Sequence, residues 1–328
     1  MNRRRDVLAV LGACAAMLPL RTVAQGKVWR VGFLSFRSHP ISLDSDVFGA
    51  FRLGMRELGY IEGKNLVIEW RFADSKLERL PDLAAELVRL RVDVIVSSGT
   101  ATTSAAQKAT VTIPIVMETN TDPVGSGFVK TLARPGGNIT GLSNISVDIS
   151  PKHLEMLLSM VPKLSRVAVL VNPSNPSHAL ILKSSRSAAQ KKSAKILPVE
   201  ARTAPEIEKA FSAMVRENAG AVIVPRDGLF IPQARQIAEL AVKNRLPSIA
   251  TFREYVETGG LMSYGSSLTD GYRRTAIYVD KIFKGANPGD LPVEQPTKFE
   301  LIINGKTAQT LGLKIPQSLL VSADKVIE

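Results

Sequence analysis

Short apolar runs alternate with longer amphipathic segments along almost the whole chain, and this alternation restricts the possible fold more than any other feature. Residues 92–96 and 113–117 are nearly all apolar, as expected of strands that are covered by helices on both faces. Segments with helical periodicity separate such runs. The pattern therefore predicts an α/β fold built on doubly wound parallel sheets.

The pattern runs through once and then starts again. The turn-rich stretch Arg134-Pro135-Gly136-Gly137-Asn138 separates the two series, so we expect two α/β lobes. The first series predicts strands at 29–35, 65–72, 92–97 and 113–117, and helices at 44–58, 77–90 and from about 102.

The second series predicts helices at 151–160, 177–195, 205–217 and 232–244, and strands at 167–171, 196–199, 221–224 and 248–251. An extended segment at 259–264, a helix at 272–283, a strand at 298–303 and a short helix at 307–311 then follow. Because this tail adds a helix and a strand after two sheets, we expect the chain to pass between the lobes more than once.

The first residues have the pattern of an export signal. Arg3-Arg4-Arg5 precedes an apolar run that ends at Leu20, and small residues follow up to Ala24, where we expect cleavage. Both the general secretory route and the twin-arginine route fit this pattern. A lipid anchor at Cys14 is less favoured, because the apolar run continues beyond it. No later stretch has the roughly 18 apolar residues of a membrane span, so we expect a soluble periplasmic protein.

The composition excludes several classes of site. The chain has 1 cysteine and 3 histidines, so it has neither an intramolecular disulfide nor a metal-ligand cluster of the usual spacing. Its net charge is +12, but nucleic acid is not the partner we expect outside the cytoplasm. Anionic lipid or acidic ligands remain open as partners of a basic exported protein.

Catalytic and cofactor motifs are also missing. The loop at 35–40 has no glycine fingerprint, and Gly125-Ser126-Gly127 lacks the third glycine of a dinucleotide site. We find neither a P-loop nor a nucleophile elbow. A Ser/His/Asp site that uses His39, His153 or His178 stays open, although a surface or capping role is the commoner explanation for His153 and His178. We therefore expect no enzyme activity, no cofactor and no metal.

Uncharged polar groups follow the predicted strands instead. Ser98 and Thr100 open a helix, where free backbone N–H groups suit a carboxylate, although simple capping by a hydroxyl explains them equally well. For Asp122, which precedes Pro123, capping is favoured over ligand contact. Four aromatic residues near strand ends could wall a cleft or be ordinary packing: Phe36, Phe230, Phe252 and Tyr264.

Several longer motifs point to one family. They are GAFR at 49–52, LGYIEGKN at 58–65, TDPV at 121–124, LARPGGNITG at 132–141, VLVNP at 169–173, GGLMSYG at 259–265 and LPVEQPT at 291–297. With these motifs, nearly the whole mature chain resembles the exported substrate-binding proteins of ABC transporters of the tryptophan/tyrosine type, which have the periplasmic-binding-protein-like type I fold.

The resemblance implies two lobes that are joined by three crossings, near 141–146, 265–269 and 291–297, with ligand held in the cleft between them. We expect lobe 1 to comprise 25–142 plus 268–294, and lobe 2 to comprise 143–267 plus 295–328. Ala250 and Gly305 depart from the family pattern, and Ala250 weakens the transfer of an aromatic ligand. The implied cleft residues are Ser35, Phe36, Ser98, Gly99, Thr100, Ala101, Thr121, Asp122, Pro173, Ser174, Asn175, Arg226, Asp227 and Tyr264.

The resemblance further implies a monomeric receptor that closes on an amino-acid-like or small carboxylate ligand and delivers it to an inner-membrane permease. In this interpretation the helix start at Ser98 holds a ligand carboxylate and Asp227 holds an ammonium group. A ligand sensor for a membrane signalling protein fits the same features. An exported α/β enzyme is the third and less favoured hypothesis.

Overall fold

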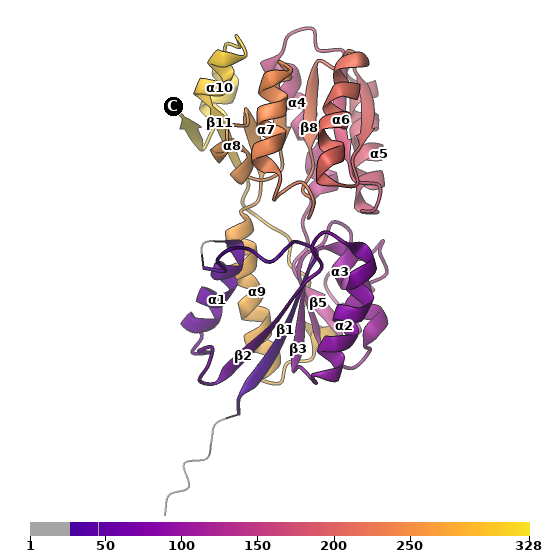
Figure 1. Cartoon of the computed structure of the whole chain (residues 1–328), viewed down its shortest axis with the longest axis vertical. Coiled ribbons are helices and arrows are strands. Elements are labelled where there is room, and N and C mark those ends of the chain that lie inside the picture. The colour runs from indigo at the N-terminus through magenta and orange to yellow at the C-terminus, as the bar shows by residue number, and fades with distance from the viewer. Residues whose placement is uncertain (1–26, 45) are drawn as a thin grey trace, which may run out of the picture.

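The computed structural model describes residues 27–44 and 46–328, and these form two α/β lobes that are stacked along the long axis of the molecule (Figure 1). The expected signal peptide, its cleavage after Ala24 and the alternative anchor at Cys14 fall on residues 1–26, outside the described part. No helix in the described part is long and apolar enough to span a bilayer.

The first lobe contains a five-stranded parallel sheet in the order β2-β1-β3-β4-β5. Helices α1 and α9 cover one face of this sheet, and α2 and α3 cover the other. The elements are β1 (Trp29–Ser35), α1 (Val47–Glu57), β2 (Leu66–Phe72), η1 (Leu77–Arg79), α2 (Leu80–Arg89), β3 (Val94–Ser98), α3 (Thr100–Ala109), β4 (Ile115–Thr119), β5 (Ile139–Gly141), α9 (Leu268–Phe283) and η2 (Pro288–Asp290).

The second lobe contains a seven-stranded sheet in the order β12-β11-β10-β9-β8-β6-β7, in which only the β10–β11 pair is antiparallel. Helices α4 and α5 pack on one face, and α6, α7 and α8 pack on the other. The elements are α4 (Ser146–Met160), β6 (Arg166–Val171), α5 (Ser177–Gln190), β7 (Lys195–Glu200), α6 (Ala204–Arg216), β8 (Ala221–Val224), α7 (Ala234–Lys243), β9 (Ser248–Ala250), α8 (Glu254–Glu257), β10 (Met262–Gly265), β11 (Glu300–Asn304), α10 (Gly305–Thr310), α11 (Gln317–Ser322) and β12 (Lys325–Ile327).

The predicted fold class is confirmed: both lobes have sheets of mainly parallel strands with helices on both faces. The chain passes between the lobes three times, from β5 to α4, from β10 to α9, and from η2 to β11. The first crossing begins at Gly141, whose φ is +124°. A Cβ atom there would lie 2.3 Å from the carbonyl oxygen of Met117, so this position requires glycine.

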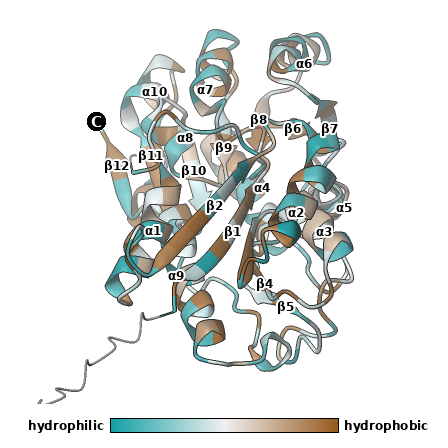
Figure 2. Ribbon diagram, turned by 60° about the horizontal axis from the view of Figure 1, so that its bottom comes forward, coloured by the Kyte–Doolittle hydropathy of each residue, from teal (hydrophilic) through white to brown (hydrophobic). Residues whose placement is uncertain are grey.

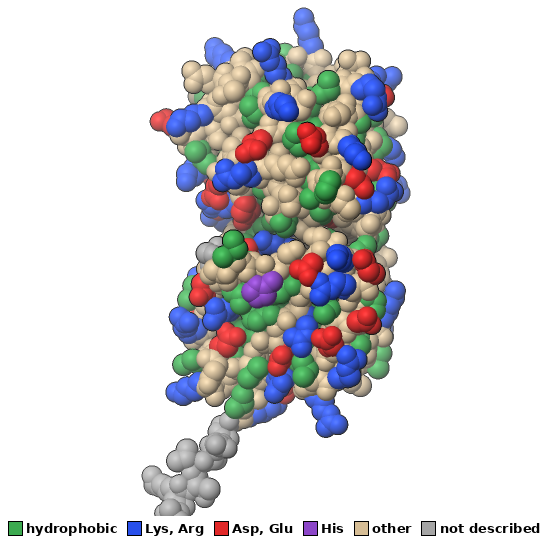
Figure 3. Space-filling model, in the orientation of Figure 1, with side chains coloured by type: hydrophobic (Ala, Val, Ile, Leu, Met, Phe, Trp, Pro, Cys, Tyr) green, Lys and Arg blue, Asp and Glu red, His purple; other side chains and the backbone are tan. Residues whose placement is uncertain are grey.

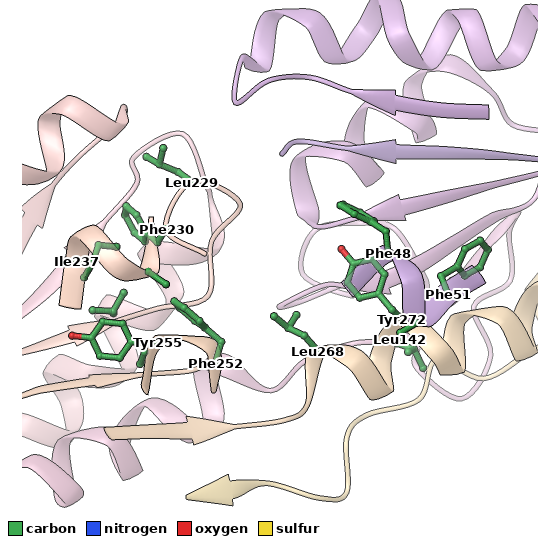
Figure 4. Close-up of a cluster of buried hydrophobic side chains, with 14 of the residues drawn as sticks. Phe48, Phe51, Leu142, Leu229, Phe230, Ile237, Phe252, Tyr255, Leu268 and Tyr272 are labelled. Atoms are coloured by element: carbon green, nitrogen blue, oxygen red, sulfur yellow. The ribbon is translucent and has the colours of Figure 1, made fainter. Parts of the chain in front are cut away.

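The largest apolar cluster extends through both lobes. In the first lobe it contains Phe33, Phe48 and Phe51, whose rings meet edge to face. Leu268 lies between this group and the buried Phe252 of the second lobe (Figure 4). The strands carry most of the apolar colour in Figure 2, and the outer faces of the helices are polar. The cores therefore reach the crossings and support the cleft from both sides.

Helix α4 begins at Ser146, five residues before the predicted start at Pro151. Proline has no N–H, so it cannot donate to the carbonyl of Val147, four residues earlier. The hydroxyls of Ser150 and Ser184 donate to that carbonyl instead, at 2.8 and 2.9 Å. These two bonds let the helix run through a proline that the sequence pattern indicated as its first residue.

Other boundaries also differ from the prediction. Helix α9 begins at Leu268, because the hydroxyl of Ser267 accepts a hydrogen bond from the Asp270 N–H and caps the helix. Helix α5 ends at Gln190, because the chain turns through a positive φ at Ser193. Strand β4 continues past its predicted end at residue 117 to Thr119, and the three-residue strand β5 was not predicted.

Candidate functional site

The carboxyl ends of the central strands of both sheets face one another across the boundary between the lobes (Figure 1). In open α/β sheets this is where ligands bind. Two cavities lie here, one of about 70 Å³ among the strand ends and one of about 280 Å³ beside the three crossings. They share four lining residues: Glu118, Thr119, Asn144 and Arg226.

The lobes touch each other beside the smaller cavity. The hydroxyls of Thr100 in the first lobe and Ser177 in the second are 3.2 Å apart. Phe36 of the first lobe packs so closely on Gly228 that a Cβ atom at Gly228 would lie 2.7 Å from the ring. In Figure 3 the lobes meet at a narrow waist. The cleft is therefore nearly closed on this side.

The helix start after β3 lies at the smaller cavity, as predicted. Gly99 is the N-cap residue of α3, with φ +105°, and no side chain caps the helix. The Gly99 carbonyl accepts hydrogen bonds from the hydroxyls of Thr102 and Thr103, at 2.7 and 2.9 Å. The backbone N–H groups of the first turn thus have no capping side chain, which is the arrangement that suits an anion.

Glu118 is the acidic group at the centre of the cleft. It lies near the end of β4, and only 2% of its surface is exposed. Its Oε2 is 3.4 Å from the Ser98 hydroxyl, which also lies 2.7 Å from the hydroxyl of Tyr272. Burial raises the pKa of Glu118 to about 7, although Arg226, Ser98 and Arg37 act in the opposite direction.

Arg226 is the basic group at the centre of the cleft, and it comes from the loop after β8. Its Nη2 donates to the carbonyl of Ser266 at 2.7 Å and to that of Thr251 at 3.4 Å. Burial lowers the pKa of Arg226, and Glu118 and Glu254 oppose this shift. The arginine thereby connects the second lobe to the crossing that leads into α9.

Asp227, the expected ammonium acceptor, lines the smaller cavity and is held there by several hydrogen bonds. Its carboxylate accepts hydrogen bonds from the side-chain amides of Asn172 (3.1 Å) and Asn175 (2.8 Å) and from the N–H of Leu229 (2.8 Å). Only 4% of its surface is exposed. Three of the roughly four acceptor sites of the carboxylate are thus used within the described chain. Asp227 fixes the loop after β6 and lines the smaller cavity together with Asn175.

His178, in the first turn of α5, holds this loop. Its Nδ1 accepts a hydrogen bond of 2.8 Å from the N–H of Asn172, so in the neutral ring the proton is on Nε2. Nε2 lies 3.5 Å from Asp227, and burial lowers the pKa of the imidazole. The residue that the sequence indicated as a capping or surface histidine is thus a buried residue in the first turn of α5 that holds the loop.

Eight of the expected residues line the smaller cavity, and six do not. The eight are Phe36, Ser98, Gly99, Thr100, Thr121, Asn175, Arg226 and Asp227. Ala101, Asp122 and Ser174 line a neighbouring groove, which residues of both lobes line and which shares Thr100 with the smaller cavity. Asp122 accepts a hydrogen bond from the N–H of Gly125 there, but it caps a turn, because no helix begins at Pro123. Pro173 is exposed at the surface.

Ser35 and Tyr264 are the other two expected residues outside the cleft. Ser35 is fully buried, and its hydroxyl accepts a hydrogen bond from the Arg37 N–H at 3.2 Å. The ring of Tyr264 packs against Phe299, and its carbonyl accepts from Nε2 of His153 at 2.7 Å. The aromatic residues Phe230 and Phe252 are buried in the core (Figure 4), so the packing interpretation holds for them.

Several residues that line the cavities were not predicted from the sequence. Glu118 lies one residue beyond the predicted end of its strand, and a strand extended to Thr119 would have placed it at the carboxyl edge of the sheet, where ligands bind. Tyr272 was assigned to a helix of the tail, and no local pattern shows that this helix returns to the first lobe. Arg37, Asn144 and Leu268 also line the cavities.

Comparison with known proteins identifies similar sequences. A family described as ABC transporter substrate binding protein matches residues 30–327. A tyrosine-binding protein from Clostridioides difficile (strain R20291) is 30% identical over 286 residues, which is 87% of this chain and 81% of the relative.

Solved structures are similar over the same length. The ABC domain in complex with L-Trp from Streptococcus pneumoniae has a TM-score of 0.83 at 27% identity, covering 91% of this chain and 99% of that chain. The ligand-free, open structure of a substrate binding protein with adhesive properties from Clostridium difficile is also 27% identical, covering 92% and 99%, with a TM-score of 0.64. The two structures are equally similar to this chain in sequence, so the higher TM-score shows that its lobes are arranged more as in the L-Trp complex than as in the open structure.

Proposed function

Because the chain belongs to the family of ABC transporter substrate binding proteins, we propose that it binds an aromatic L-amino acid between its lobes and delivers it to a membrane permease. The observation that most supports this proposal is the cleft between the lobes. There a buried carboxylate, a guanidinium and several hydroxyls from both lobes surround two cavities that share lining residues. Such a set of groups recognises a small polar ligand.

The arrangement of the lobes supports binding by closure. The Thr100–Ser177 and Phe36–Gly228 contacts join the lobes only when these are close together. Ligand then favours the closed state through contacts that neither lobe offers alone. The three crossings lie beside the larger cavity and supply the segments about which a hinge motion would occur.

The similar proteins support an amino acid as ligand. One relative is named for tyrosine, and one solved structure contains L-Trp. The family and these relatives are binding proteins, which favours a receptor over an exported enzyme. The permease partner, the monomeric state and the periplasmic location of the mature chain belong to the same proposal.

Calorimetry with the purified mature chain tests this function. L-tyrosine and L-tryptophan are titrated at about pH 8, with L-aspartate and D-tyrosine as controls. We expect one L-aromatic amino acid to bind with a stoichiometry of one, and at about a hundred times Kd to stabilise the fold by about 2.7 kcal/mol. Failure of both L-amino acids to bind would overturn the proposal.

A further inference from the structure

Glu118 and Arg226 face the same space from opposite lobes, and both line the smaller and the larger cavity. We propose that they hold the two charged ends of a zwitterionic α-amino acid, with the ammonium group on Glu118 and the carboxylate on Arg226. The inference rests on the proposed function and deepens it, because it names the residues that recognise the amino and carboxyl groups.

Glu118 has unused capacity to accept hydrogen bonds. A carboxylate offers about four acceptor sites, yet the hydrogen bond that Glu118 makes within the described chain is the long one of 3.4 Å from Ser98. A buried charge without a close partner is costly. An ammonium group in the adjoining cavity supplies both the opposite charge and three donors.

Arg226 has unused donors. Both of its hydrogen bonds within the described chain come from Nη2, to the carbonyls of Ser266 and Thr251. A guanidinium has five N–H donors in a planar fork, which matches a carboxylate. Nε and Nη1 are thus available to a ligand, and the two bonds to carbonyls hold the guanidinium in place for it.

The other polar groups that face Glu118 are already paired. Arg37, from the loop after β1, makes two hydrogen bonds of 2.9 and 2.8 Å to Asp46. Tyr272, from α9, lies 2.7 Å from the hydroxyl of Ser98 on β3. Of the two arginines near Glu118, Arg226 is therefore the one that has no carboxylate within ion-pair distance in the described chain. Glu118 is also too far from Arg226 for a direct ion pair.

This assignment also predicts that ligand binding is coupled to the release of a proton from Glu118. Burial raises the pKa of Glu118 to about 7, and an ammonium group beside it would lower the pKa again. Ligand therefore binds the ionised form and displaces a proton at or below neutral pH. Affinity should fall about tenfold between about pH 8 and pH 6, because one carboxyl group becomes protonated over this range.

Calorimetry of Glu118→Gln with L-tyrosine and L-tryptophan tests the assignment. At about pH 8 we expect at least about tenfold weaker binding than in the wild type, and no pH dependence down to pH 6. Asp280→Asn is the matched control, since Asp280 is a buried carboxylate of the same lobe that is paired with Tyr60 and Lys284 away from the cleft. This control should bind and titrate like the wild type.

Ligand analogues separate recognition from a simple attraction between the lobes. Tyramine lacks the carboxylate, and 3-(4-hydroxyphenyl)propionate lacks the ammonium group. Glu118→Gln should weaken L-tyrosine and tyramine but not the propionate, whereas Arg226→Gln should weaken L-tyrosine and the propionate but not tyramine. Equal losses for all three ligands would show that the residues act only on closure, which would overturn the assignment.

The remaining outcomes are also distinct. If the wild type binds either amino acid and Glu118→Gln binds it within about twofold, the assignment is wrong and the proposed function stands. If Glu118→Gln keeps the wild-type pH dependence, the proton belongs to another group and the assignment is again wrong. If the wild type binds neither amino acid, the proposed function fails and this inference fails with it.

Discussion

The hydroxyl of Thr100 lies 3.2 Å from the hydroxyl of Ser177, and this hydrogen bond joins the first turn of α3 in one lobe to that of α5 in the other. Thr100→Val should remove it at little cost in volume. Since a neutral hydrogen bond contributes about 1 kcal/mol, we expect the variant to bind ligand about fivefold more weakly, with unchanged thermal stability of the free protein. Ser212→Ala, an exposed hydroxyl on α6, is the control. Unchanged affinity in Thr100→Val would show that this bond does not contribute to closure.

Gly228→Ala should hold the lobes apart. A Cβ atom at this position would lie 2.7 Å from the ring of Phe36, too close for both residues to stay in place. We expect a larger radius of gyration by small-angle scattering and weaker ligand binding. The double variant Phe36→Ala with Gly228→Ala should restore the smaller radius, because the small side chain leaves room for the new methyl group. A single variant as compact as the wild type would contradict this steric account.

Asp227→Ala should destabilise the free protein. Three donors, the buried ones of Asn172 and Leu229 and the partly buried one of Asn175, would lose their acceptor. We expect a loss of about 2–4 kcal/mol in the free energy of unfolding, measured by denaturant titration without ligand. Glu208→Ala, an exposed carboxylate on α6, should change stability by less than about 0.5 kcal/mol. If Asp227 only contacted ligand, its removal would leave the stability of the free protein unchanged.

Glu118 should also make stability depend on pH. Its pKa of about 7 in the folded state is above its ordinary value of 4.5, so the folded state retains a proton that the unfolded state has lost. Stability relative to Glu118→Gln should therefore fall as pH rises from 4.5 to about 7, by about 3 kcal/mol in total, and then stay constant. Denaturant titrations of both proteins between pH 5 and 8 measure this difference. A difference that does not change with pH would mean that the carboxyl group has an ordinary pKa.

The main strands and helices could be predicted from sequence because their patterns are local. The strands β1 and β8 were predicted at their observed bounds, since each is an apolar run between turns. The start of α4 could not be predicted, because two hydroxyls, one of them from α5, satisfy the carbonyl that Pro151 leaves free. Such compensation depends on residues that are distant in sequence.

Roles within the cleft were harder to predict than its position. Asp227 was expected to meet ligand and it does line the smaller cavity, but its additional role in the loop depends on donors 52 and 55 positions earlier, which no local pattern indicates. Tyr264 was transferred from the family resemblance, yet its strand places the ring against Phe299. Glu118 was missed because a charged residue at the end of an apolar run was interpreted as loop. Only the tertiary structure shows that it is buried beside Arg226.

The most direct test is a crystal structure of the mature chain grown at about pH 8 with the amino acid that calorimetry identifies. We predict ligand density between the lobes, with the ammonium group within hydrogen-bond distance of Glu118 and the carboxylate within that distance of Arg226. Ligand bound outside the cleft, or within it in the reverse orientation, would contradict this mechanism of recognition.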